Sequence, residues 1–164
     1  MDLLESVKRF LEDEDGENES TIDSLPAKFI EPIVGQGLKV DLVERGRLIC
    51  SLKVPPRLVD DSNRLHGGAM ATLLDLLSST VFHTVELGTF HSGVSVEINI
   101  SFVDVAVLGE EIEIDSKVLS VGKMICVASV ELRKKETGKI IAQGRHTKYL
   151  GIGSTAAADN YIEV

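Results

Sequence analysis

The residue with the clearest chemical potential is a carboxylate in an otherwise apolar stretch. Asp75 lies within HGGAMATLLDLLSSTVF, residues 66–82, whose apolar residues predict a helix with little polar surface. An unpaired charge in such a helix is costly, so Asp75 either has a strong hydrogen-bonding partner, reaches a water-filled cleft, or is partly protonated. A bond to the hydroxyl of Thr72 or Ser79, each one turn away, would give it a purely structural role.

The start of the same helix carries a second chemical feature. Gly67 and Gly68 remove side chains where the first helical amides point outward. Those amides, with the positive end of the helix dipole, are suited to hold a developing oxyanion. His66, which precedes them, is interpreted either as a helix cap or as a catalytic residue.

The distance between these two features favours a shared site. Gly67 and Asp75 are eight residues apart, which is about 12 Å along a helix axis. One reacting carbon would have to lie about 3 Å from both groups. We therefore expect a two-fold dimer in which the helix start of one subunit faces Asp75 of the other.

The elements around this helix are predicted to be strands. Period-two alternation predicts a hairpin over 38–54 that turns at Glu44-Arg45-Gly46, followed after the helix by strands over 94–102, 111–121, 124–134 and 140–150. In the first of these four, apolar residues alternate with Ser95, Glu97, Asn99 and Ser101. The turns between the last three strands are too short for a parallel crossover. The expected fold is α+β: an antiparallel sheet of about six strands wrapped around one long central helix.

Three segments are expected along the chain. Residues 1–35 contain a short amphipathic helix, with Leu3, Leu4, Val7, Phe10 and Leu11 on one face, and an acidic linker at 12–20. Residues 36–151 form the main domain. Residues 152–164 are expected to be a flexible tail.

Composition narrows the classes of function. The chain has 164 residues, the size of one domain, and a formal net charge of −9, which disfavours nucleic-acid binding. No apolar run approaches the roughly 20 residues that cross a bilayer, and the N-terminus resembles no signal or transit peptide. Cys50 and Cys126 lie in apolar runs and are expected to be buried, reduced thiols. These features predict a cytoplasmic protein without membrane insertion.

Three motifs together resemble one family. RLHGGAMATLLDLLSS, GVSVEINISF and GKIIAQGRHTKYLG occur in this order at family-like spacing. They are similar to the PaaI-like branch of the hotdog-fold acyl-CoA thioesterases, and most of all to the eukaryotic acyl-CoA thioesterase 13 group. The resemblance covers about residues 38–151.

The resemblance implies both an activity and roles for single residues. It implies hydrolysis of an acyl-CoA thioester without a metal or organic cofactor, in homodimers that often pair into tetramers. Asp75 matches the catalytic carboxylate, as general base or as nucleophile, and the Gly67 amide matches the donor that polarises the carbonyl. His66 matches the histidine near that carbonyl, and Ser95 the serine near the attacking water.

One position departs from the family pattern. Close relatives usually have asparagine six residues before the HGG histidine, where it helps to position the substrate, but this chain has Asp60 there. A carboxylate beside a thioester carbonyl would oppose oxyanion formation unless it is turned away or protonated. Either Asn63 takes over this role or the activity is reduced.

Further residues are candidates for binding coenzyme A and the acyl group. Gly68 belongs to the expected oxyanion-binding turn. The coenzyme carries phosphates, so Arg145, His146 and Lys148 on the final strand, or Lys123 in its turn, are candidates for a basic rim. The acyl pocket is expected beside Met70, Leu73, Leu74 and Leu77.

Two rival functions remain open at this stage. Asp61-Ser62-Asn63-Arg64-Leu65-His66 also resembles the DxNPLH signature of hotdog-fold enoyl-CoA hydratases, although Arg64 replaces the proline and the motif does not explain Asp75. The other rival is a non-catalytic acyl-CoA binding protein, silenced by Asp60.

Overall fold

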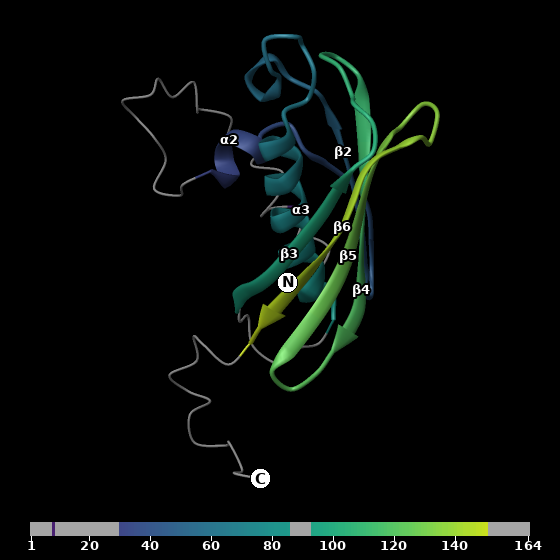
Figure 1. Ribbon diagram of the computed structural model, residues 1–164. Helices are drawn as coiled ribbons and strands as arrows, with labels where there is room; N and C mark the ends of the chain where they lie inside the picture. The colour runs from purple at the N-terminus through teal and green to yellow at the C-terminus, as the bar shows by residue number, and fades with distance from the viewer. Residues whose placement is uncertain (1–7, 9–29, 86–92, 151–164) are drawn as a thin grey trace.

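The fold is a curved antiparallel sheet with a long helix on its concave side (Figure 1). The computed structural model describes residue 8 and residues 30–85 and 93–150, and within these ranges it has six strands and one long helix. The expected N-terminal helix, the acidic linker and the C-terminal tail lie outside the described residues.

The element order confirms the expected arrangement of two strands, a helix and four strands. The strands are β1 (Lys39–Glu44), β2 (Arg47–Lys53), β3 (Val94–Phe102), β4 (Glu111–Val121), β5 (Ile125–Lys134) and β6 (Ile140–Tyr149), and the helix is α3 (Gly67–Val81). Every neighbouring pair is antiparallel, in the order β1-β2-β4-β5-β6-β3. The crossover through α3 therefore places β3 at the end of the sheet, beside β6.

Three short helices complete the described part of the chain. They are α2 (Glu31–Gly35), η2 (Pro56–Leu58) and η3 (Phe82–Thr84). Pro32 occupies the first turn of α2, where proline has no amide bond to lose. The Val34 side chain of α2 is buried against the core that α3 and the sheet share.

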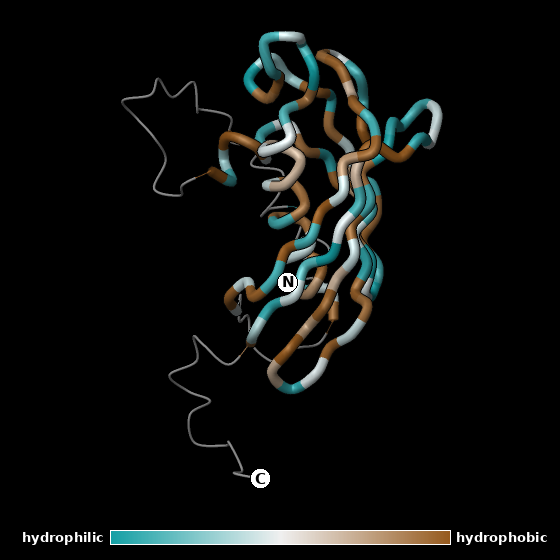
Figure 2. Tube along the Cα trace, in the orientation of Figure 1, coloured by the Kyte–Doolittle hydropathy of each residue, from teal (hydrophilic) through white to brown (hydrophobic). Residues whose placement is uncertain are grey.

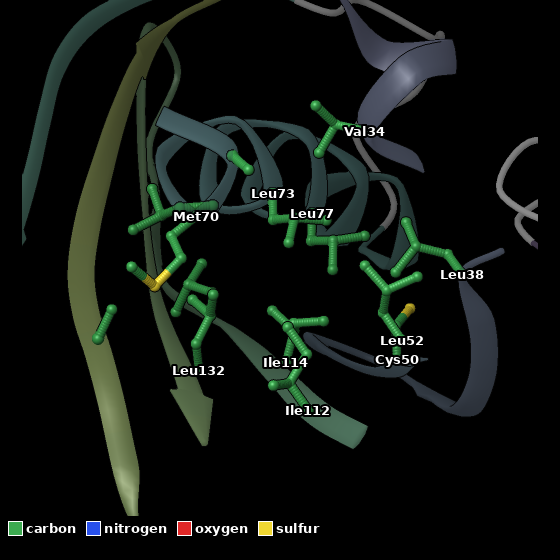
Figure 3. Close-up of a cluster of buried hydrophobic side chains, with 14 of the residues drawn as sticks. Val34, Leu38, Cys50, Leu52, Met70, Leu73, Leu77, Ile112, Ile114 and Leu132 are labelled. Carbon is green, nitrogen blue, oxygen red and sulfur yellow. The ribbon is translucent and has the colours of Figure 1, made fainter. Parts of the chain in front are cut away.

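The core lies between α3 and the concave face of the sheet. Leu73, Leu74 and Leu77 of α3 are fully buried. Figure 3 shows Leu73 and Leu77 facing strand residues such as Ile112, Ile114 and Leu132. Each buried leucine stabilises the fold by about 1.5–3 kcal/mol. Along the strands apolar and polar residues alternate, as expected for a sheet with one covered face (Figure 2).

The helix is covered on one side only. The sequence predicted that the sheet would enclose α3, because its residues are apolar nearly all round. The α3 residues Thr72, Asp75, Leu76 and Ser79 are instead only partly buried. One side of α3 therefore remains open, and Asp75 lies on it.

Strand β3 departs from simple alternation in a way that matters for the site. Ser95 pairs with Lys148 and Glu97 pairs with Thr147, so Val96 is an extra residue in a bulge. Alternation grouped Ser95 with Glu97 on the polar face of the strand. The bulge reverses this relation and turns Ser95 to the concave face, where α3 lies.

Candidate active site

Asp75 lies in the middle of α3, and its side chain is 48% exposed. The two hydroxyls that could have given it a structural role have other partners. Thr72 Oγ1 donates to the Gly68 carbonyl, and Ser79 Oγ accepts from Lys148. The Asp75 carboxylate therefore lies on the open side of α3, where solvent can reach it.

His146 of β6 lies between Asp75 and Ser95. Its side chain is fully buried, and its Nδ1 is 2.6 Å from Ser78 Oγ and 3.6 Å from Asp75 Oδ1. Its Nε2 is 2.8 Å from Ser95 Oγ. One imidazole thus connects the helix carboxylate to the strand serine.

The hydrogen bonds around Ser78 assign the His146 tautomer. Ser78 Oγ lies 2.6 Å from the Leu74 carbonyl, which accepts its single proton. Ser78 must then accept from His146 Nδ1–H, which leaves Nε2 to accept from the Ser95 hydroxyl. The lone pairs of Ser95 Oγ can consequently accept a hydrogen bond from a water molecule.

The surroundings of His146 keep it uncharged. Burial lowers the pKa of His146; the Asp75 carboxylate raises that pKa in part, and the charge of Lys148 lowers it further. A neutral imidazole at neutral pH is the form that the assigned tautomer requires.

The helix start is built by His66. His66 is the N-cap of α3, and its Nδ1 accepts from the Gly68 amide at 3.0 Å. The first amides of a helix have no acceptor within it, so the Gly67 amide remains open while the Gly68 amide is capped. This confirms the capping interpretation of His66 and separates the roles of the two glycines.

Asp60 is bonded within the loop before α3. Asp60 Oδ1 accepts from the Ser62 and Arg64 amides, and its Oδ2 pairs with the Arg64 guanidinium at 2.9 Å. Hydrogen bonds from the Arg64 amide first, and then from the Arg64 side chain, lower the pKa of Asp60. The Asp60 carboxylate thus stays ionised, and the Arg64 guanidinium balances its charge. Asn63 adopts φ of 58°, and its carbonyl accepts from Leu108. The Asp60 carboxylate is therefore engaged within the loop.

The basic residues of β6 do not form one rim. Arg145 is exposed, and because neighbours on a strand point to opposite faces it lies on the convex face, away from α3. His146 and Lys148 point to the concave face and are buried. Neither has the exposure that a phosphate-binding group on a surface rim needs.

Sequence reasoning missed two contributors, Ser78 and Ser79. Both follow Asp75 by about one turn, so helical spacing places them beside it. Ser79 was considered only as a partner for Asp75, and the partners that the structure gives the two serines lie on β6. The roles of Ser78 and Ser79 can be predicted only once β6 is known to pack against α3.

The arrangement can activate water but contains no recognised metal cluster. Among the described residues, no three His, Cys, Asp or Glu side chains are grouped so that they could hold a metal ion. Within the same ranges, no helix is long and apolar enough to cross a membrane. An open carboxylate beside a serine acceptor suits the deprotonation and orientation of a water molecule.

Comparison with known proteins identifies the family. Residues 62–141 match the family model of the thioesterase superfamily. Acyl-coenzyme A thioesterase 13 of Mus musculus is 46% identical over 115 residues, which cover 69% of this chain and 81% of that protein. This chain therefore belongs to the thioesterase superfamily.

Solved structures agree with this assignment. The crystal structure of thioesterase superfamily member 2 from Mus musculus has a TM-score of 0.75 at 32% identity, covering 92% of this chain and 99% of that one. The zebra fish thioesterase superfamily member 2 has a TM-score of 0.72 at 38% identity, covering 77% of this chain and 88% of that one. The hotdog fold expected from the motifs is confirmed.

Proposed function

We propose that this protein hydrolyses an acyl-CoA thioester to a free acid and coenzyme A. The observation that carries the proposal is the Asp75–His146–Ser95 array on the open side of α3. Its support is the 46% identity to a relative named acyl-coenzyme A thioesterase 13. The hydratase and the non-catalytic binding protein do not account for this array.

In the proposed reaction, Ser95 Oγ accepts a hydrogen bond from one O–H of the attacking water, and Asp75 removes the other proton as general base. The oxygen adds to the thioester carbonyl, and the resulting oxyanion is held by an open Gly67 amide at a helix start. Collapse of this intermediate breaks the C–S bond and releases the thiolate, which is a good leaving group. The acyl pocket expected beside Met70, Leu73, Leu74 and Leu77 is not formed by the described chain, because these side chains are buried in the core between α3 and the sheet.

We propose that the Gly67 amide comes from the partner subunit of a two-fold dimer. Both groups belong to the continuous helix α3, so the separation of about 12 Å applies within one chain. β3 supports the proposal because it is the last strand of the described sheet and carries exposed apolar side chains, Val94, Val96, Ile98 and Phe102. An edge of this kind pairs readily with another strand.

A dimer of dimers in the cytoplasm completes the proposal. A second group of exposed apolar side chains, Leu119, Val121, Met124 and Ile125 around the β4–β5 turn, supports a further contact between copies. Cys50 and Cys126 are buried thiols not joined in a disulfide, as expected in a reducing compartment. Analytical ultracentrifugation of the full chain measures the assembly, and a fluorescent fusion its location.

The test is a panel of fatty and aromatic acyl-CoA substrates, with free thiol measured over time. We expect thiol release from at least one class, with a preference that reports the shape of the acyl pocket. A crotonyl-type thioester distinguishes a thioesterase from a hydratase. A hydratase would remove the conjugated absorbance without releasing thiol, whereas a thioesterase would release thiol. A folded protein that binds acyl-CoA and releases no thiol from any substrate contradicts the proposal.

A further inference from the structure

Lys148 is a buried cation directly behind the proposed catalytic array. It follows His146 by two residues on β6, so both side chains point to the concave face. Lys148 is 6% exposed, and its Nζ donates to Ser79 Oγ at 3.0 Å. Ser79 lies one turn beyond Asp75 on α3, which brings the ammonium to the helix face that carries the carboxylate.

The burial of this ammonium is costly, because Ser79 is a neutral partner. Burial lowers the pKa of Lys148, and the Asp75 carboxylate first, and then the Cys126 side chain, raise it in part. The titratable groups that face Lys148 are Asp75 from α3, Cys126 from β5 and His146 from its own strand, with His83 from η3 also within its field. Lys148 is therefore a buried cation close enough to Asp75 and His146 to influence their charge states.

His146 is the neighbour through which that charge can affect the catalytic array. An imidazole 3.6 Å from a carboxylate tends to take up a proton. A protonated His146 would carry a hydrogen on Nε2, and this hydrogen would point at Ser95 Oγ. The hydrogen bond would then run from histidine to serine, and Ser95 would lose an acceptor position for water.

We propose that Lys148 is a positioning residue, whose buried ammonium adds to the effect of burial in keeping His146 uncharged beside the Asp75 carboxylate and so maintains the direction of the Ser95–His146 hydrogen bond. The catalytic consequence rests on the proposed function, because it requires that Ser95 orients the attacking water. The charge of His146 is a property of the free protein. Lys148 thus has an electrostatic role in place of the phosphate contact expected from sequence.

The first experiment titrates the His146 imidazole by NMR in the full-length protein and in Lys148→Met, which keeps the length of the stem and removes the charge. The His146 signal is identified by its loss in His146→Asn. We expect the titration to move to higher pH in Lys148→Met and to stay near the wild-type position in Lys148→Arg.

The second experiment measures kcat and KM against pH on the best acyl-CoA substrate. Since His146 must be neutral, the acid limb of kcat moves to higher pH in Lys148→Met, and the loss of rate is about tenfold larger at pH 6 than at pH 8. KM should change less than about twofold, because Lys148 does not touch the coenzyme in this account. Lys148→Arg should restore the acid limb.

Several results would overturn the inference. One is an unshifted His146 titration in folded Lys148→Met, and another is a raised KM with an unchanged pH profile, which would restore the phosphate-binding role. If Lys148→Met does not fold, Ser79→Ala releases the ammonium from its anchor and must move the His146 titration in the same direction. Absence of thioesterase activity in the wild type would overturn the proposed function, while the NMR titration would still decide the role of Lys148.

Discussion

His146 Nε2 lies 2.8 Å from the hydroxyl of Ser95, although 51 residues separate the two in the sequence. The bulge at Val96 in β3 produces this contact by turning Ser95 toward α3. The fixed tautomer of His146 then makes the serine the donor in this bond. As a result, the lone pairs of the serine oxygen are available to a water molecule beside Asp75.

Replacing Ser95 by alanine should therefore weaken catalysis without abolishing it. We expect Ser95→Ala to lower kcat by about 10- to 100-fold, because Asp75 can still deprotonate a less well-oriented water. Steady-state kinetics measure this loss. Ser101→Ala removes a hydroxyl from the opposite face of the same strand and should retain wild-type kcat; equal losses in both variants would show an effect of the strand alone.

Removing the base should have the largest effect. Asp75→Asn keeps the size of the side chain, and we expect kcat to fall by at least about 10²- to 10⁴-fold while the dimer persists. Thiol release and sedimentation measure the two properties. Glu113→Gln, which removes a carboxylate from the convex face of β4, is the matched control. Unchanged turnover in Asp75→Asn would exclude Asp75 from the mechanism.

The helix start can be altered without a clash inside the subunit. A Cβ atom at Gly67 would lie 3.7 Å from the Phe102 ring, which is an ordinary contact. Gly67→Ala should therefore keep or slightly raise the free energy of unfolding, yet raise KM and lower kcat by obstructing the approach of the substrate to the amide. Gly68→Ala, whose Cβ would lie 3.0 Å from His66 Nδ1, should disturb the cap instead. Full activity in Gly67→Ala would remove this amide from the oxyanion site.

Burial of two histidines predicts how stability depends on pH. Burial lowers the pKa of both His146 and His83, so the unfolded chain binds more protons than the folded protein just below the ordinary histidine pKa of about 6.5. The free energy of unfolding should consequently fall as the pH drops from about 6.5 to 5. Urea unfolding at several pH values measures it, and His146→Asn should flatten the slope. Stability that rises toward pH 5 would contradict a neutral buried His146.

Much of the fold could be predicted from local sequence patterns. The bounds of β3 and β4 agree with the alternation of apolar residues, and the short turns fixed the antiparallel order. The helix start was predicted by Gly67 and Gly68, because glycines after a capping residue are a local signal. These features depend on neighbours within a few residues.

The rest required contacts between distant segments. The half-open surface of α3 depends on where the sheet ends, and the orientation of Ser95 depends on a bulge that period-two reasoning cannot detect. Lys148 was named as a candidate for a basic rim, because residue type gives no sign of the depth at which β6 lies. The Asp60–Arg64 ion pair, at the one position that departs from the family pattern, likewise depends on the conformation of the loop that contains Asn63.

The central claim, that each site combines Asp75 of one subunit with the helix start of the other, is tested by a mixed dimer. Asp75→Asn and Gly67→Val are co-expressed with different affinity tags, and the heterodimer is isolated by two successive purifications. Each homodimer carries one defect in both sites and should be inactive, whereas the heterodimer concentrates both defects in one site. We expect the heterodimer to recover about half of the wild-type kcat per dimer; a heterodimer as inactive as its parents would place both groups in a single chain and contradict the account.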